Sequence, residues 1–70
     1  MADEKMVTIG NNLKRIRCNA KMDVNTVAEK MNLTRQSIYK WEHGETLPQA
    51  DRMIDLMMLY AVYDIRELIK

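Results

Sequence analysis

The sequence contains few of the residues from which catalytic and metal sites are built. Its 70 residues include one cysteine, Cys18, and one histidine, His43. A single cysteine excludes an internal disulfide, and one histidine supplies too few ligands for a metal site. We therefore expect no metal site and interpret Cys18 as an ordinary helix residue. The sequence also has no glycine-rich phosphate loop and no serine, histidine and acid grouping, so neither an enzyme nor a bound cofactor is expected.

Long hydrophobic runs are also missing. No apolar stretch approaches the roughly 18 residues that a membrane-spanning helix needs. The first residues, MADEKM, are too acidic and polar for a secretory signal, and we expect residues 1–8 to form a flexible N-terminal arm. With 47% hydrophobic and 30% charged residues, residues 9–70 are expected to form one globular domain. Seven methionines and an unpaired cysteine fit a cytoplasmic location.

The formal net charge is only +1, but it is spread unevenly along the chain. Residues 14–40 hold seven basic and two acidic side chains, a balance of +5, whereas residues 45–70 have a balance of −2. This asymmetry favours a first half that meets a polyanion. The alternative is that these lysines and arginines only solvate helix surfaces.

Apolar residues recur at helical spacing, so the predicted fold is all-α, a compact five-helix bundle. The predicted helices span residues 9–19, about eight residues from Val24, residues 35–43 and residues 49–60, and a fifth helix begins after Asp64. Asp23, Thr34 and Asp64 are the predicted N-caps, each flanked by the apolar pair of a hydrophobic staple. Glu67 stands where it would complete a capping box with Asp64.

The second and third predicted helices are separated by only two or three residues around Asn32 and Leu33. Asparagine tolerates the left-handed backbone angles that a tight corner requires. Gly44 is the predicted C-terminal cap of the third helix, and Pro48 precedes the fourth. Two short helices joined in this way form a helix-turn-helix.

In the third predicted helix, Ile38 and Trp41 share an inward face with Glu42 at its edge. The opposite face carries planar hydrogen-bonding groups: an arginine fork matches guanine, and a glutamine amide matches adenine, in the DNA major groove. The hydroxyls of Tyr39 and Thr34 suit phosphate oxygens. The alternative is an ordinary solvated helix face.

The fourth predicted helix has more apolar residues than one buried face can hold. Met53, Leu56, Met57 and Tyr60 are assigned to the core. The remaining apolar residues are expected to form an exposed surface for self-association, and they are Met58, Leu59, Tyr63, Ile65 and Ile69.

Several stretches resemble the Cro and phage-repressor helix-turn-helix family, also called Xre-type: IGNNLKRIR, VAEKMNLTRQSIYKWEHG, and the later LP and IRELI. The resemblance covers about residues 9–69. It implies a five-helix domain that enters the major groove with its second motif helix, as a two-fold dimer that regulates transcription. It further implies an Arg17–Glu42 ion pair inside the fold. Base reading is implied for Arg35, Gln36, Ser37 and Lys40, and backbone contact for Asn25, Thr34, Tyr39 and His43.

Three positions depart from the family pattern. Val24 replaces a glutamine that contacts phosphate, Asn32 replaces the turn glycine, and Val62 replaces a glycine before the last helix. Valine does not adopt left-handed angles easily, so a rebuilt junction is expected at Val62.

Two functions are open on these grounds. The first is a sequence-specific DNA-binding regulator, a repressor that reads a palindromic operator as a homodimer. The alternative is a protein-interaction module, such as an antitoxin-like partner of a toxin or antirepressor, with secondary DNA binding.

Overall fold

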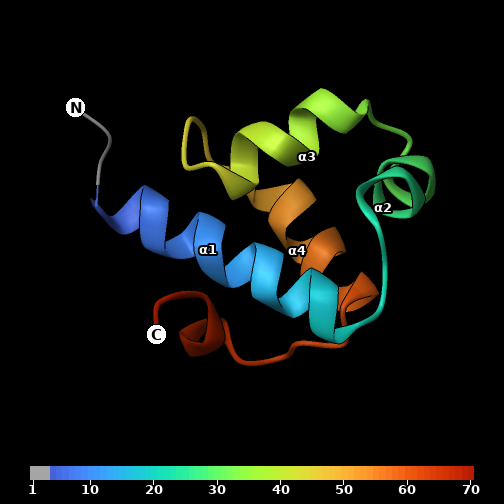
Figure 1. Ribbon diagram of the computed structural model, residues 1–70. Helices are drawn as coiled ribbons and strands as arrows, with labels where there is room; N and C mark the ends of the chain where they lie inside the picture. The colour runs from blue at the N-terminus through green and yellow to red at the C-terminus, as the bar shows by residue number, and fades with distance from the viewer. Residues whose placement is uncertain (1–3) are drawn as a thin grey trace.

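The computed structural model describes residues 4–70, and its elements are helices joined by short turns (Figure 1). Across this stretch four α-helices are followed by one 3-10 turn: α1 (Glu4–Asn19), α2 (Val24–Met31), α3 (Arg35–Glu42), α4 (Ala50–Leu59) and η1 (Ile65–Leu68). The all-α prediction is confirmed, although the fifth element is a 3-10 turn and not an α-helix. Within residues 4–70 no helix has the length and apolar character needed to cross a membrane.

Helix α1 is longer than predicted. It begins at Glu4, so the predicted start at Ile9 was wrong, and five residues of the expected arm are helical. Residues 1–3 of that arm lie outside the described residues. Val7 explains the extension, because it packs against Gly44 at the far end of α3. Glu4 also places a negative charge at the positive end of the helix.

Helix α1 runs through the middle of the molecule (Figure 1). It packs against α3 on one side and against η1 and the C-terminal segment on the other. The core between the helices contains Ile9, Leu13, Ile16, Val24, Val27, Ala28, Met31, Ile38, Trp41, Leu56, Tyr60 and Leu68. Leu56 and Tyr60 are buried as predicted, while Met53 and Met57 are only partly buried at its edge. Both faces of α1 are therefore fixed by packing.

The predicted N-caps are confirmed. An Asp23 carboxylate oxygen accepts from the Thr26 N–H at 2.7 Å, and the Thr34 hydroxyl accepts from the Ser37 N–H at 3.4 Å. Asp64 accepts from the Arg66 N–H at 3.0 Å. The predicted capping box at Glu67 is wrong, because its carboxylate instead forms an ion pair with Lys70 at 2.8 Å.

Each α-helix is followed by a residue with left-handed backbone angles, and these residues are Lys21, Asn32, Gly44 and Ala61. In each case the next N–H donates to the carbonyl five residues back, for example Leu33 to Ala28 at 2.8 Å, which is the Schellman ending of a helix. The predictions for Asn32 and Gly44 are confirmed. At the junction expected to be rebuilt, Ala61 takes the left-handed angles with φ 57, and Val62 donates to Met57.

Acid is expected to weaken the start of α2. The hydrogen bond from the Thr26 N–H holds the pKa of Asp23 below its usual range, because it favours the ionised carboxylate. A group whose pKa is lower in the folded state contributes stability above its unfolded-state pKa of about 3.9 and loses it as the pH falls through the folded value. Asp23→Asn keeps a capping oxygen that does not titrate. Urea unfolding of both proteins between pH 6 and 2.5 should show the wild-type advantage shrinking toward the acid end, and a constant difference would contradict this.

Candidate nucleic-acid interface

Helices α2 and α3 meet at a sharp corner. Asn32 takes φ 56 and ψ 46, and its N–H donates back into the last turn of α2. The chain then passes Leu33, which is partly buried against the core, and reaches the N-cap Thr34. Since α2 and α3 also pack against each other, the corner is rigid at both ends. The pair has the form of a helix-turn-helix.

The buried side of α3 sets its rotation. Ile38 is 1% exposed, Trp41 is buried beside it, and Glu42 is 5% exposed. Burial of these three residues turns the opposite side of α3 to solvent, as predicted from their spacing. Glu42 was predicted at the edge of this face but lies within it.

The solvent side of α3 carries most of the residues predicted to touch DNA. Arg35, Gln36, Tyr39, Lys40 and His43 are exposed. Thr34 and Tyr39 line a shallow hollow with Arg35 and Gln36. The rings of Tyr39 and His43 lie one helical turn apart, with centroids 6.1 Å from each other. Arg35, Gln36 and Lys40 are thus free to reach outward from one helix.

Two residues predicted to contact DNA, Ser37 and Asn25, do not lie on the solvent side of α3. Ser37 is partly buried, and its hydroxyl lies 3.3 Å from that of Thr34, so it belongs to the cap at the start of α3. Asn25 is exposed in the first turn of α2, next to the buried Val24. Helix N-termini and their polar neighbours attract phosphate. The first turns of α2 and α3 are therefore both accessible to a phosphate group from solvent.

Arg17 and Glu42 form a two-pronged ion pair inside the fold. The Arg17 Nε donates to Glu42 Oε2 at 2.7 Å and its Nη2 donates to Oε1 at 3.1 Å. The remaining arm, Nη1, donates to the Met22 carbonyl at 2.9 Å. The hydrogen bond to Glu42 raises the pKa of Arg17 above its already high value, so the guanidinium stays charged. One side chain of α1 thereby ties the α1–α2 connection to the end of α3.

The chain has two glycines, and both lie where α1 meets the end of α3. A Cβ on Gly10 would stand 2.6 Å from the Trp41 carbonyl oxygen and 2.7 Å from that of Glu42. A Cβ on Gly44 would stand 3.0 Å from the Val7 Cα. These close backbone approaches set the distance between α1 and α3. The sequence contained no local signal for the contact at Gly10.

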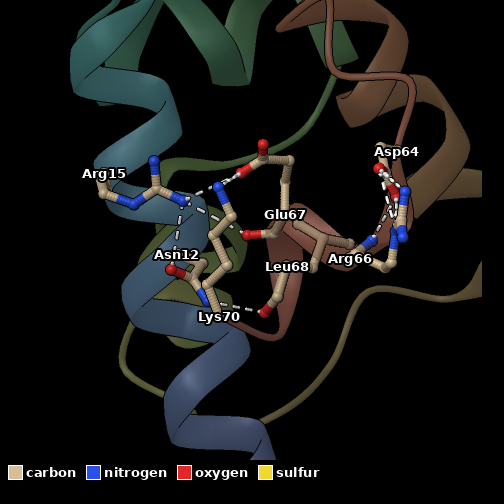
Figure 2. Close-up of polar contacts among 7 residues, drawn as sticks. All are labelled: Asn12, Arg15, Asp64, Arg66, Glu67, Leu68 and Lys70. Atoms are coloured by element: carbon tan, nitrogen blue, oxygen red, sulfur yellow. Dashed lines mark hydrogen bonds and ion pairs between the residues drawn. The ribbon is translucent and has the colours of Figure 1, made fainter.

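Two further polar contacts were missed by sequence reasoning. Asn12 is buried and donates to the Leu68 carbonyl at 2.8 Å, which anchors the C-terminal segment to α1 (Figure 2). Arg52 of α4 reaches the Met31 carbonyl at the end of α2, at 3.4 Å. Both join residues far apart in sequence, so a local pattern could not reveal them.

The apolar surface predicted for self-association is mostly exposed. Met58, Tyr63, Ile65 and Ile69 have exposed fractions of 57% to 80%. Leu59 differs, because it is partly buried and packs against the core. Ile54, one turn before Met58 on α4, is 58% exposed and was not predicted. These residues belong to α4 and the C-terminal segment, so none of them occupies the solvent side of α3.

A tight two-helix corner with an open polar second helix, held by an all-α core, defines a helix-turn-helix domain. Comparison with protein-family models gives the same result in more detail: residues 13–68 match the helix-turn-helix family HTH_3. The chain belongs to this family, the Cro/C1 or Xre type, and the resemblance seen in its sequence is confirmed. Membership implies that the protein binds DNA as a transcriptional regulator, and the family is non-catalytic. No curated protein and no solved structure matched in the corresponding comparisons.

Proposed function

We propose that this protein is a transcriptional repressor that binds a palindromic or nearly palindromic operator as a homodimer. The observation that carries the proposal is the solvent side of α3, where Arg35, Gln36 and Lys40 are exposed around a rigid buried face. In a two-fold dimer, paired α3 helices about 34 Å apart would enter successive major grooves on one side of the duplex. We also propose a cytoplasmic location, within reach of the DNA.

Base reading is assigned to the first turns of α3. Arg35 offers a fork of donors to guanine, and Gln36 one position later offers a donor and an acceptor to adenine. Lys40 lies one turn beyond Gln36 and reaches either a base edge or a phosphate, and Ser37 contributes from the cap. Backbone contacts are assigned to Asn25, Thr34, Tyr39 and His43, which border this surface.

The dimer is assigned to the exposed apolar side chains of α4 and the C-terminal segment. Met58 and Tyr63 are 64% and 80% exposed. Burial of such side chains between two copies supplements a small core. Because they lie outside α2 and α3, pairing through them leaves the α3 surface open to DNA.

Selection of bound sequences from a random duplex pool, with purified protein at physiological salt, tests this function. An enriched inverted repeat would support specific dimeric readout and would give the operator in the same step. Enrichment of a single half-site would support base reading without the dimer. Binding that depends on salt but enriches no sequence would contradict the proposal, because phosphate contacts alone are independent of sequence.

Arg35→Ala is expected to weaken binding to the selected operator by about 1 to 3 kcal/mol and to relax the preference at one base pair of each half-site. Affinity for unrelated DNA should change much less. Lys14→Ala is the control, since Lys14 is also an exposed basic side chain but lies on α1, outside the solvent side of α3 and outside the segment assigned to the dimer. Fluorescence anisotropy with the operator and with a scrambled duplex measures both. Equal losses on the two duplexes would mean that Arg35 contacts only phosphate.

The second candidate, an antitoxin-like interaction module, is favoured by the same exposed apolar side chains. It predicts a chain that stays monomeric, selects no DNA sequence and forms a stoichiometric complex with a different protein. Sedimentation of the purified protein distinguishes the two, because the repressor is expected to be a dimer at the concentrations at which it binds its operator.

A further inference from the structure

A cavity of about 520 Å³ lies between the last turns of α1 and the segment that follows α4. This volume falls within the range of about 300 to 1,000 Å³ that is usual for small-molecule sites. Its apolar lining includes Ile16, Ala20 and Val62, and its polar lining includes Arg15 and Tyr60. The cavity is separated from the solvent side of α3 by α1 itself, so it is distinct from the DNA-binding surface.

Arg15 has hydrogen-bond donors to spare. Its Nη2 donates to Asn12 Oδ1 and to the Glu67 carbonyl, both at 3.3 Å, and lies 3.9 Å from a Glu67 carboxylate oxygen (Figure 2). Both hydrogen bonds are long, and the one to the Glu67 carbonyl is exposed. Within residues 4–70 the other two guanidinium nitrogens, Nε and Nη1, have no partner. Arg15 can therefore bind a carboxylate with two parallel hydrogen bonds.

Tyr60 supplies a second polar group. Tyr60 is among the residues that line the cavity and is only 8% exposed, yet its hydroxyl has no hydrogen-bond partner in the described chain. Every fully buried polar side-chain atom of residues 4–70 does have a partner, so solvent reaches this hydroxyl. Burial raises the pKa of Tyr60, which keeps the hydroxyl protonated as a donor.

The charged residues that line the cavity are Arg15, Asp64 and Glu67. Its two rim carboxylates are already paired: Asp64 with Arg66 at 2.8 Å and Glu67 with Lys70 at 2.8 Å (Figure 2). Arg15 forms only a long ion pair, since the nearest carboxylate oxygen, that of Glu67, stands 3.9 Å from its Nη2. Arg15 is therefore the weakly paired charge of the lining, and it stands beside an apolar floor.

We propose that this cavity binds a small organic carboxylate, with the carboxylate between Arg15 and Tyr60 and an apolar body against Ile16, Ala20 and Val62. The ligand would replace the long contact between Arg15 and Glu67. Glu67 belongs to the same C-terminal segment as Tyr63, Ile65 and Ile69. Binding of a ligand in the cavity would therefore also shift the positions of those exposed side chains. The site itself does not depend on the DNA-binding proposal.

The test is a titration of 15N-labelled full-length protein, without DNA, followed by amide chemical shifts. The probes are phenylacetate and hexanoate, their uncharged amides, and inorganic phosphate, each to roughly 10 mM. The carboxylates are expected to give saturable shifts centred on residues 15–20 and 60–67. The amides should bind at least about tenfold more weakly, because a hydrogen bond to a charged group contributes this much or more.

Matched variants make the outcome decisive. Arg15→Gln should weaken carboxylate binding at least about tenfold and Tyr60→Phe about threefold. Lys14→Gln, which removes the neighbouring positive charge of α1 outside the cavity, should leave it unchanged. Thermal melts of each variant exclude loss of folding as the cause.

Four results would overturn the proposal: no saturable shift with either carboxylate, equal shifts with phosphate alone, equal binding by Arg15→Gln, or shifts centred on α3. Dilution without any ligand provides the remaining check. If the same amides shift with protein concentration, a second copy of the chain occupies the cavity and the small-molecule site is wrong.

Discussion

Replacing Glu42 with alanine is expected to remove about 3 to 5 kcal/mol of folding free energy. Glu42 is 5% exposed and binds Arg17 with both carboxylate oxygens. Without it, a buried guanidinium keeps only the Met22 carbonyl at 2.9 Å as partner. A domain of this size has a total stability of about 4 to 10 kcal/mol, so the variant should be partly unfolded near physiological temperature. Urea unfolding followed by circular dichroism measures the loss.

The double variant Arg17→Met, Glu42→Leu is the control for this result. Replacing both members of a buried ion pair with apolar residues removes the desolvation cost together with the attraction, so stability should return to within about 1 to 2 kcal/mol of wild type. Additive losses in the double variant would show that the two charges act independently. Raising the salt concentration should change the effect of Glu42→Ala little, because buried pairs are poorly screened, whereas DNA binding should weaken steeply.

Gly44→Ala is expected to cost about 3 kcal/mol. One part is backbone strain, since Gly44 has φ 75 and left-handed angles cost an alanine about 1 kcal/mol. The larger part is overpacking, because the new Cβ would stand 3.0 Å from the Val7 Cα and 3.1 Å from the Val7 N, which are backbone atoms. The affected contact joins the start of α1 to the end of α3. Thermal and urea unfolding measure the cost.

Two comparison variants separate the parts. Ala61 already has φ 57 and is exposed, so Ala61→Gly reports strain alone and should stabilise the protein by about 1 kcal/mol. Gly10 lies inside helix α1 at 2.6 Å from a carbonyl oxygen, so Gly10→Ala reports overpacking, reduced by about 1 kcal/mol of improved helix propensity. If the stability lost in Gly44→Ala is no larger than the stability gained in Ala61→Gly, the loss is backbone strain alone and Val7 does not restrict the side chain at position 44.

The same contacts connect stability to DNA recognition. Arg17, Glu42, Gly10 and Gly44 all act between α1 and the last turn of α3, and none of them is on the solvent side of α3. Variants that weaken this junction but still fold should lower operator affinity without changing which bases are preferred. That pattern differs from the loss of one base preference expected for Arg35→Ala.

The elements and the helix-turn-helix were predictable because their signals are local. An N-cap such as Asp23 bonds an N–H three residues away, and a corner such as Asn32 needs only one residue that tolerates left-handed angles. The outward position of Arg35 and Gln36 follows from the spacing of Ile38 and Trp41 on the same helix. The ion pair of Arg17 and Glu42 was predicted from the family resemblance alone. No local pattern could predict it, since 25 residues separate its partners.

The sequence by itself determined the order of the helical elements, the N-caps Asp23, Thr34 and Asp64 and the polar side of α3, because each depends on residues within about one or two helical turns. Tertiary structure decided how far α1 extends, that Glu67 pairs with Lys70 and does not cap, and that Asn12 holds Leu68. It also decided that both glycines serve one helix contact. Such features depend on which surfaces meet when distant segments pack, and this information is not contained in any local stretch of the chain.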